Sequence, residues 1–275
     1  MTKRKIKWKN LFLIVIIFIC LVFFCYSIFD ILKWKSDTKE IENQVENIHD
    51  IVEIKEIEDD DDTEIIIQDA SIPKENPYWD YIKMNLIDVK FDELLKINSS
   101  VKGWIQVNGT NINYPFVQHS DNSFYLNHSF DDSYNDAGWV FLDYRNDSEI
   151  LDQNTIIYAH SRLDESMFGS LKKILKNGWL DKEDNHVIKL STLKENTLWQ
   201  VFSIYHIPTS SDYLRINFNS NDDFNSWNSM IIDRSLHDFK TTVSTNDKIL
   251  TLSTCYGKDE KLVVHAKLIK KEIRH

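Results

Sequence analysis

The hydrophobic and polar positions divide the chain into three parts. Residues 11–29, LFLIVIIFICLVFFCYSIF, carry no charge and are almost all large and apolar. Residues 36–74 are polar and acidic, and they include the run EIKEIEDDDDTEIIIQD. From residue 77 onward, short apolar stretches alternate with turn residues. This last pattern predicts a folded domain rich in strands.

The apolar segment is long enough to cross a membrane. At about 1.5 Å per residue, nineteen helical residues span roughly 28 Å, close to the thickness of the hydrocarbon layer. The basic residues before it place the N-terminus in the cytoplasm and the rest of the chain outside. A cleaved signal peptide is the alternative, but DILKWKS follows where small residues should precede the cleavage site. We therefore predict a cytoplasmic tail at 1–10 and an uncleaved single-pass anchor at 11–29.

The acidic segment at 30–76 predicts an extended extracellular stalk, because a run of like charges repels itself and has little to bury. Ile65–Ile67 could still form a short strand or dock on the domain. The apolar spacing near Ile41, Val45 and Ile48 is too brief for a coiled coil. The folded domain is expected to begin near Pro77 and to run to the end of the chain, as 77–275.

The pattern in this domain predicts a mostly β fold with helical insertions. Helical spacing is expected across 77–98, in a segment 166–176, and in 221–239, where acidic residues in the first turn suit the helix dipole. Eight strand-like stretches alternate with these segments, and they suggest a closed or nearly closed β-barrel. The stretches are 103–107, 111–118, 138–143, 154–160, 186–191, 198–207, 248–255 and 262–269.

Charge and cysteine content narrow the function. The net charge of −11, with no evident basic face, argues against nucleic-acid binding. Cys20 and Cys25 lie in the apolar segment, so Cys255 is the only cysteine in the rest of the chain. It has no partner for a disulfide within the domain, and an unpaired thiol outside the cytoplasm suggests a chemical task.

Cys255 and His160 occupy similar places in the pattern. Each comes at the end of an apolar strand, KILTLSTC or NTIIYAH, just before a polar loop. A thiol nucleophile needs a nearby group that handles its proton, and histidine is the usual one. The alternatives are an inert buried thiol and a loop histidine without a role. The two positions are far apart in sequence, so only the fold can bring them together.

Acyl transfer by a thiol also needs a group that stabilises the developing oxyanion. Lys261 begins the strand after the Cys255 strand, so it would face the thiol across the mouth of a hairpin. The alternative is an ordinary solvated lysine. The order of histidine before cysteine differs from that of papain-like proteases. Zinc, P-loop and dinucleotide motifs are absent from the sequence, so we expect neither a metal nor another cofactor.

These residues resemble those of the sortases, and specifically of class B. The similarity covers roughly residues 77–270 and includes the cysteine motif TLSTC and the histidine segment YAHSRLDESMFGSL. YPFVQHSDNSFYLNHSF, AGWVFLDYRN and YLRINF are similar to class B segments in the same order. The resemblance implies an eight-stranded sortase-like β-barrel with N-terminal helices and a helix before the cysteine strand.

The resemblance also implies a function. Such an enzyme is a membrane-anchored cysteine transpeptidase of a Gram-positive cell surface, which cleaves a C-terminal sorting signal after its threonine. Its partners would be surface proteins or pilins, and an amine acceptor such as a peptidoglycan precursor. By position, Cys255 is the nucleophile and His160 the proton shuttle. A hydrolytic cysteine peptidase and a degenerate sortase that binds signals with little turnover remain as alternatives.

One position departs from the family pattern. Sortases have an arginine where this chain has Lys261, and lysine lacks the planar fork that can donate two parallel hydrogen bonds. Arg215 and Arg162 are the other candidates for the role. The resemblance further implies a substrate groove lined by Asn122, Leu126, Thr209, Tyr213 and Ser253. Core packing or turn formation would explain several of these residues equally well.

Overall fold

The computed structural model describes residues 8–57, 65–67 and 78–274. The chain divides into an N-terminal unit that ends at Gln44 and a larger unit that begins at Val45. The positively charged residues before residue 8, the acidic run at 58–64 and residues 68–77 lie outside the described residues. The expected start of the domain at Pro77 falls in the last of these ranges.

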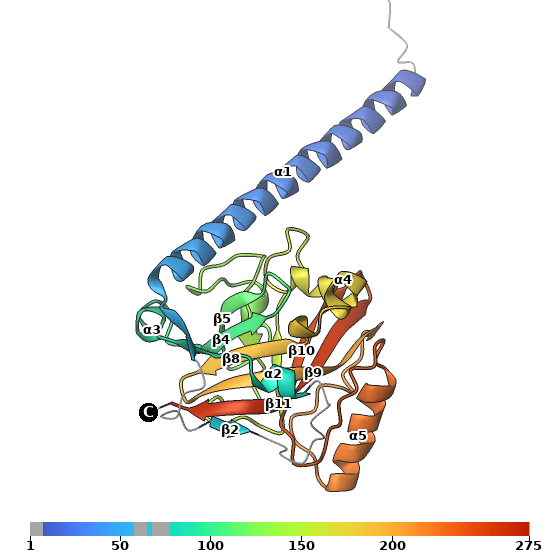
Figure 1. The fold of residues 1–275 in the computed structure, drawn as a ribbon. Helices are drawn as coiled ribbons and strands as arrows, with labels where there is room; N and C mark the ends of the chain where they lie inside the picture. Colours follow the sequence, from blue (N-terminus) through green and yellow to red (C-terminus); the bar gives the residue numbers. More distant parts are fainter. Residues whose placement is uncertain (1–7, 58–64, 68–77, 275) are drawn as a thin grey trace, which may run out of the picture. The chain divides into compact units, whose positions relative to one another are not determined.

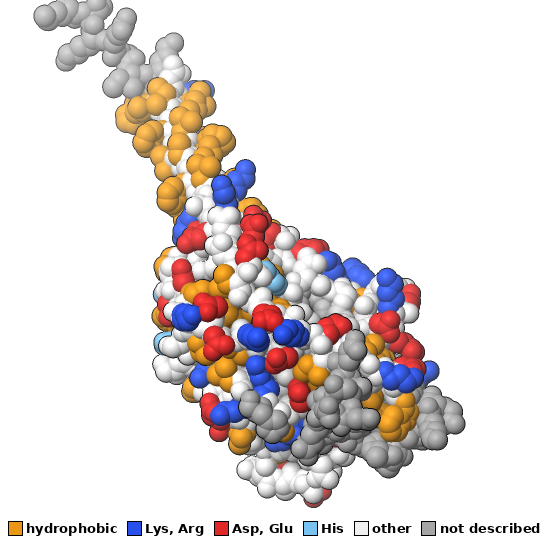
Figure 2. Space-filling view, turned by 60° about the vertical axis from the view of Figure 1, so that its left-hand side comes forward, with side chains coloured by type: hydrophobic (Ala, Val, Ile, Leu, Met, Phe, Trp, Pro, Cys, Tyr) orange, Lys and Arg blue, Asp and Glu red, His pale blue; other side chains and the backbone are white. Residues whose placement is uncertain are grey.

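One long helix, α1 (Trp8–Ile51), makes up the described part of the N-terminal unit and continues into the larger one (Figure 1). Among the described residues it is the one helix long and apolar enough to cross a membrane. Apolar side chains cover its N-terminal part (Figure 2). The expectation of an extended stalk from residue 30 is wrong as far as Ile51, because KWKSDTKEIENQVENIHDI contains no Pro or Gly and is rich in helix formers.

The larger unit begins earlier than expected, at Val45 instead of Pro77. The last turns of α1 pack into it, since Ile48 is buried and the ring of His49 meets that of Trp104 edge-on at 5.3 Å. β1 (Ile54–Ile57) then pairs with β3, and β2 (Ile65–Ile67) pairs with β11, so the short-strand alternative for Ile65–Ile67 is confirmed. A short strand can form with few apolar residues when its backbone hydrogen-bonds to the edge of an existing strand.

The segment 77–98 is helical only at its two ends. α2 (Tyr78–Ile82) and α3 (Asp92–Ile97) flank β3 (Leu86–Val89). Leu86, Ile87 and Val89 are buried, and β3 pairs in antiparallel register with β1. The prediction of helix for these residues is wrong because pairing and burial override the helical spacing.

Eight strands form the closed barrel that the sequence predicted. In spatial order they are β10, β7, β6, β5, β4, β8, β9 and β11, and the pairing of β10 with β11 closes the ring. The β10–β7 and β5–β6 pairs are parallel, and the others are antiparallel. The bounds are β4 (Val101–Val107), β5 (Asn113–Val117), β6 (Phe141–Leu142), β7 (Asn154–Tyr158), β8 (Val187–Thr192), β9 (Glu195–Pro208), β10 (Ile249–Tyr256) and β11 (Glu260–Ile273).

Short helices lie in the connections. The insertion expected at 166–176 is the 3₁₀ helix η2 (Gly169–Leu175), followed by α4 (Asn177–Leu180) and η3 (Glu183–Asn185). Between β5 and β6 lies the 3₁₀ helix η1 (Phe124–Leu126).

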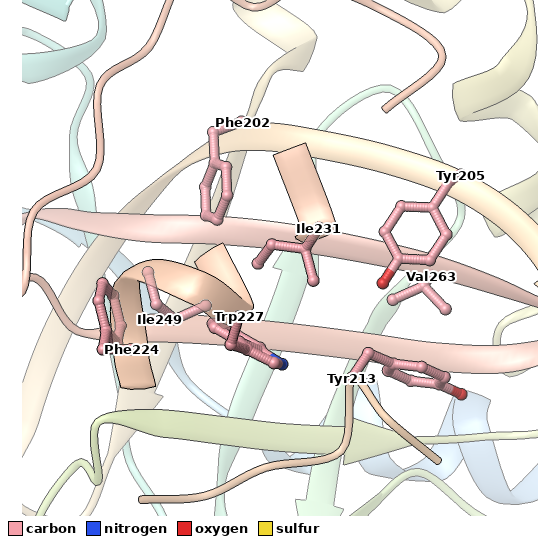
Figure 3. Close-up of a cluster of buried hydrophobic side chains, with 8 residues drawn as sticks. All are labelled: Phe202, Tyr205, Tyr213, Phe224, Trp227, Ile231, Ile249 and Val263. Carbon is pink, nitrogen blue, oxygen red and sulfur yellow. The ribbon is translucent and has the colours of Figure 1, made fainter. Parts of the chain in front are cut away.

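The helix expected before the cysteine strand is α5 (Asn221–Asp233), which begins where the Ser220 side chain accepts a hydrogen bond from Asp223 N. Its apolar face packs on the barrel wall (Figure 3). That cluster consists of Phe224, Trp227 and Ile231 from α5 with Phe202, Tyr205, Tyr213, Ile249 and Val263.

Candidate active site

Parallel pairing of β7 with β10 brings the ends of the histidine and cysteine strands to one rim of the barrel. Ser253 lies opposite Tyr158 in the register, and Cys255 and His160 each follow two residues later. One residue before them, Thr254 Oγ1 donates a hydrogen bond of 2.7 Å to the Ala159 carbonyl. Since parallel strands end at the same edge of a sheet, the two predicted catalytic residues both lie at that edge.

Lys261 is the direct cross-strand partner of Cys255 in the β10–β11 hairpin. Directly opposite residues project to the same face of a sheet, so the two side chains meet. Lys261 Nζ donates to Cys255 Sγ at 3.2 Å. The thiol is exposed and Lys261 is half-buried, so a positive charge stands beside an accessible sulfur.

His160 is held by the backbone of η1. Its Nε2 lies 2.7 Å from the Leu126 carbonyl oxygen. A carbonyl oxygen only accepts, so Nε2 carries the hydrogen. In the neutral ring Nδ1 is therefore the nitrogen that can take up a proton, and the charged ring can release that proton again. The imidazole is half-buried at the rim, which leaves it open to a substrate.

Gly138 makes room for this contact. Its φ of +63° is a left-handed conformation, and a Cβ there would stand 2.5 Å from the Tyr125 carbonyl oxygen and 2.9 Å from that of Leu126. The same Cβ would lie 3.0 Å from His160 Cδ2. Only glycine therefore fits between η1 and the histidine ring.

A cavity of about 650 Å³ lies along this rim, and all eight residues that the sequence analysis assigned to the site line it. Catalytic candidates and groove candidates thus share one surface. The lining also includes Ser210, Ser211 and Thr254, so hydroxyl groups dominate its polar part. Among the described residues, no group of three His, Cys, Asp or Glu side chains is arranged to hold a metal ion.

The predicted groove residues are fixed in different ways. Tyr213 is buried, its hydroxyl lies 2.9 Å from Ser253 Oγ, and burial raises its pKa. Thr209 donates from both N and Oγ1 to the Asp259 carbonyl, at 3.0 and 3.1 Å, which joins the β9–α5 loop to the hairpin turn. Leu126 is 42% exposed and offers an apolar surface to the cavity.

The two arginines considered as alternative cations, Arg215 and Arg162, contact residues other than Cys255. Arg215 forms two hydrogen bonds to Asp223, at 2.9 and 2.5 Å, and its guanidinium lies over the Phe218 ring. Arg162 is paired with Asp164 at 2.9 Å and is largely buried. Neither of them lines the cavity. Lys261 is the basic side chain that lines the cavity beside Cys255.

Sequence reasoning missed several lining residues, chiefly Tyr158, Phe141 and Leu214. A signal for Tyr158 existed. It precedes His160 by two residues, and the two-residue period of a strand places both on one face. No comparable signal marks Leu214, because its place depends on the path of the β9–α5 loop.

Comparison with known proteins decides the family. A family model for the sortase domain matches residues 105–269. The chain belongs to the sortase family. Sortase B of Staphylococcus aureus (strain NCTC 8325 / PS 47) is 35% identical over 185 residues, which cover 66% of this chain and 75% of that protein. The chain is therefore a sortase B family member and a cysteine transpeptidase.

Solved structures of sortase B agree with the observed fold. The structure of B. anthracis sortase B in complex with AAEK2 is 33% identical in sequence and superposes with a TM-score of 0.66. The match covers 86% of this chain and 97% of the B. anthracis chain. A Staphylococcus aureus sortase B-substrate complex and a sortase B complexed with triglycine are each 34% identical, with TM-scores of 0.61. Each match covers 66% of this chain, and it covers 84% of the chain in the substrate complex and 85% of the chain in the triglycine complex.

Proposed function

We propose that this transpeptidase cleaves a C-terminal sorting signal after its threonine and joins the released protein to an amine. The observation that carries the proposal is the 3.2 Å contact from Lys261 Nζ to Cys255 Sγ, in a cavity that His160 also lines. A nucleophile, a proton carrier and a cation on one accessible surface are the groups that acyl transfer requires.

In the first half-reaction, the Cys255 thiol gives its proton to Nδ1 of His160. The Cys255 Sγ thiolate then attacks the carbonyl carbon of the substrate threonine, and the carbonyl electron pair moves onto the oxygen. The Lys261 ammonium group donates a hydrogen bond to this oxyanion. When the oxyanion collapses, the C–N bond breaks and His160 gives a proton to the leaving amine. The product is a thioester on Cys255.

In the second half-reaction, the acceptor amine attacks the thioester carbonyl and gives a proton to His160. Lys261 again stabilises the oxyanion, the C–S bond breaks, and the sulfur leaves with its electron pair. Asn122, Leu126, Thr209, Tyr213 and Ser253 would hold the peptide in the cavity that they line. The hydroxyl-rich lining suits the amide groups of an extended peptide.

The apolar part of α1 would anchor the enzyme to the cytoplasmic membrane. Its length and composition support a single span, and the basic residues before it support a cytoplasmic N-terminus. The larger unit would then act outside the cell on surface proteins or pilins. The substrate and triglycine complexes of related sortases support a peptide donor and an amine acceptor.

The test is turnover of the larger unit with a library of sorting peptides of the N-P-x-T type, with and without triglycine. We expect a peptide–triglycine product, and no product from Cys255→Ala. Cleavage without ligation would favour the hydrolase. Binding without any cleavage by the parent, followed by cleavage with Lys261→Arg, would identify a sortase disabled at the cation.

A further inference from the structure

A buried carboxylate, Asp143, stands behind the cavity wall and takes no part in the steps above. It directly follows β6 and is fully buried. Burial alone would raise its pKa, but hydrogen bonds from Arg145 and Tyr158 outweigh burial and lower the pKa. Asp143 is therefore ionised at neutral pH, and an ionised carboxylate only accepts hydrogen bonds.

Two side chains of the cavity lining donate to this carboxylate. Asn122 Nδ2 and the Tyr158 hydroxyl reach Oδ2 at 3.1 and 2.8 Å. Arg145 completes the arrangement, with Nε at 2.9 Å from Oδ1 and Nη2 at 2.7 Å from Oδ2. The charge is thus paired in the bidentate geometry typical of arginine and carboxylate.

These contacts decide which polar atoms face the cavity. Because the carboxylate cannot donate, the amide nitrogen of Asn122 must face it, and the Tyr144 backbone N–H donates to the amide oxygen at 2.9 Å. One N–H of Asn122 is then left for a ligand. Tyr158 has given its only hydrogen to Asp143, so its oxygen can only accept.

Arg145 also contacts the loop that follows β9. Its Nη2 donates to the Leu214 carbonyl oxygen at 3.3 Å, and Leu214 lines the cavity beside Tyr213. The ion pair therefore joins the wall that carries Asn122 and Tyr158 to the loop that follows β9. The Arg145 side chain is 40% exposed, whereas Asp143 is inaccessible.

We propose that Asp143 and Arg145 are positioning residues that set substrate affinity. They hold one N–H donor, from Asn122, and one acceptor, the Tyr158 oxygen, toward a bound peptide. A peptide amide offers the complementary carbonyl and N–H groups. The inference rests on the proposed function, because it takes the cavity as the peptide site.

The experiment is steady-state kinetics of Asp143→Asn with the best peptide of the library and triglycine. An amide nitrogen cannot accept a hydrogen bond, and in either orientation of the new side chain it would face groups that donate, from Arg145 or from Asn122 and Tyr158. The substitution therefore breaks part of the arrangement. We expect KM to rise about tenfold, in line with the loss of an oriented hydrogen bond worth about 1.4 kcal/mol, with kcat within about threefold of the parent. Asp223→Asn is the matched control, because it makes the same change in the Arg215 pair outside the cavity.

A double-mutant cycle separates positioning from general stability. In an Asn122→Ala/Tyr158→Phe background the groups to be oriented are gone, so Asp143→Asn should add no further rise in KM. Should Asp143→Asn fail to fold, Arg145→Lys replaces it; this variant keeps the charge without the planar fork, and we expect a KM about threefold higher. An unchanged KM in Asp143→Asn, or in Arg145→Lys where that variant replaces it, would overturn the inference. So would a rise in KM of about tenfold when Asp143→Asn is added to the Asn122→Ala/Tyr158→Phe background.

Peptide binding keeps this test distinct from that of the proposed function. Affinity for the same library is measured in a Cys255→Ala background, where no turnover occurs. Weaker binding by Asp143→Asn in that background supports the inference even if the parent never turns over, in which case only the proposed function fails. If the parent turns over but Cys255→Ala binds the peptides equally well with and without Asp143→Asn, the inference fails and the proposed function stands.

Discussion

Two polar pairs on the same face of the β10–β11 hairpin differ in what their surroundings allow. Cys255 lies opposite Lys261 at the open end, and Thr251 lies opposite His265 four residues deeper. The outer thiol is exposed and receives a hydrogen bond from Lys261. The inner pair is fully buried. Cysteine and histidine are both residue types that can take part in acyl transfer, and on this hairpin burial separates the accessible one from the inaccessible one.

The inner pair is fully hydrogen-bonded. Thr251 Oγ1 donates to Asn154 Oδ1 at 2.7 Å, so it accepts from His265 Nδ1 at 2.9 Å. His265 Nε2 then accepts from the Tyr205 hydroxyl at 2.8 Å. Every hydrogen has an acceptor when His265 is neutral. A satisfied buried network stabilises the hairpin, whereas the accessible sulfur at the tip remains open to a substrate.

The largest effect should come from His160, the histidine that stands at the rim. His160→Ala removes the group that gives a proton to the leaving amine, and we expect kcat to fall at least about a thousandfold. The measurement is ligation of the best library peptide to triglycine. His265→Asn, corrected for the fraction folded, is the comparison; a similar loss there would refute the distinction between the two histidines.

The next effect concerns the cation beside the thiol. Lys261→Ala should lower kcat about a hundredfold, because it removes the donor to the oxyanion. Lys261→Arg should keep at least about a tenth of the parent activity. Full activity of Lys261→Ala would show that another group stabilises the oxyanion, and Arg162→Ala and Arg215→Ala would then be measured in the same assay.

Gly138→Ala should act on the same rim through His160. The added Cβ would meet two backbone carbonyl oxygens that cannot swing away, so η1 and the imidazole must shift. We expect kcat to fall about tenfold, since small misplacement of a catalytic group is costly. Gly257→Ala is the control, because its φ is +65° but nothing lies within 4 Å of the new Cβ. Equal losses in both variants would reduce the effect to backbone strain.

The barrel could be predicted because each of its strands is an apolar run between turn residues. All eight predicted strands are confirmed, and the helix before β10 begins at Asn221 as its apolar spacing predicted, although it ends at Asp233 and not at residue 239. Residues 86–89 differ, because Leu86 and Ile87 continue the apolar spacing of α2 and so predict helix where the chain forms a strand. Their partner β1 lies in the acidic segment, and local periodicity carries no information about such distant pairing.

The site was predictable to the extent that it lies at strand ends. Cys255 and His160 end neighbouring strands, and Lys261 follows from the hairpin register. The support around them was not predictable. Asp143 meets Asn122 and Tyr158 only because three separate segments converge, and nothing in the sequence near Gly138 reveals the carbonyl groups that exclude a Cβ.

The smallest effect on activity at neutral pH, and the clearest on stability, should come from His265. Burial, together with the nearby positive charge of Arg234, lowers the pKa of His265 to about 3, whereas an unfolded histidine titrates near 6.5. Between these values the unfolded chain binds a proton that the folded chain does not. This group therefore destabilises the fold as pH falls from about 6.5 toward 3, by at most about 1.4 kcal/mol per pH unit, and has no such effect above pH 7.

Urea unfolding of the larger unit at several pH values measures this contribution. Because other groups also titrate, the quantity to compare is the difference in slope between the parent and His265→Asn. We expect the variant to be less stable at pH 7, where it loses the hydrogen bonds to Thr251 and Tyr205, but to lose less stability on acidification. If His265→Asn kept the full slope, His265 would be protonated in the folded state, and burial would not be what separates the two pairs.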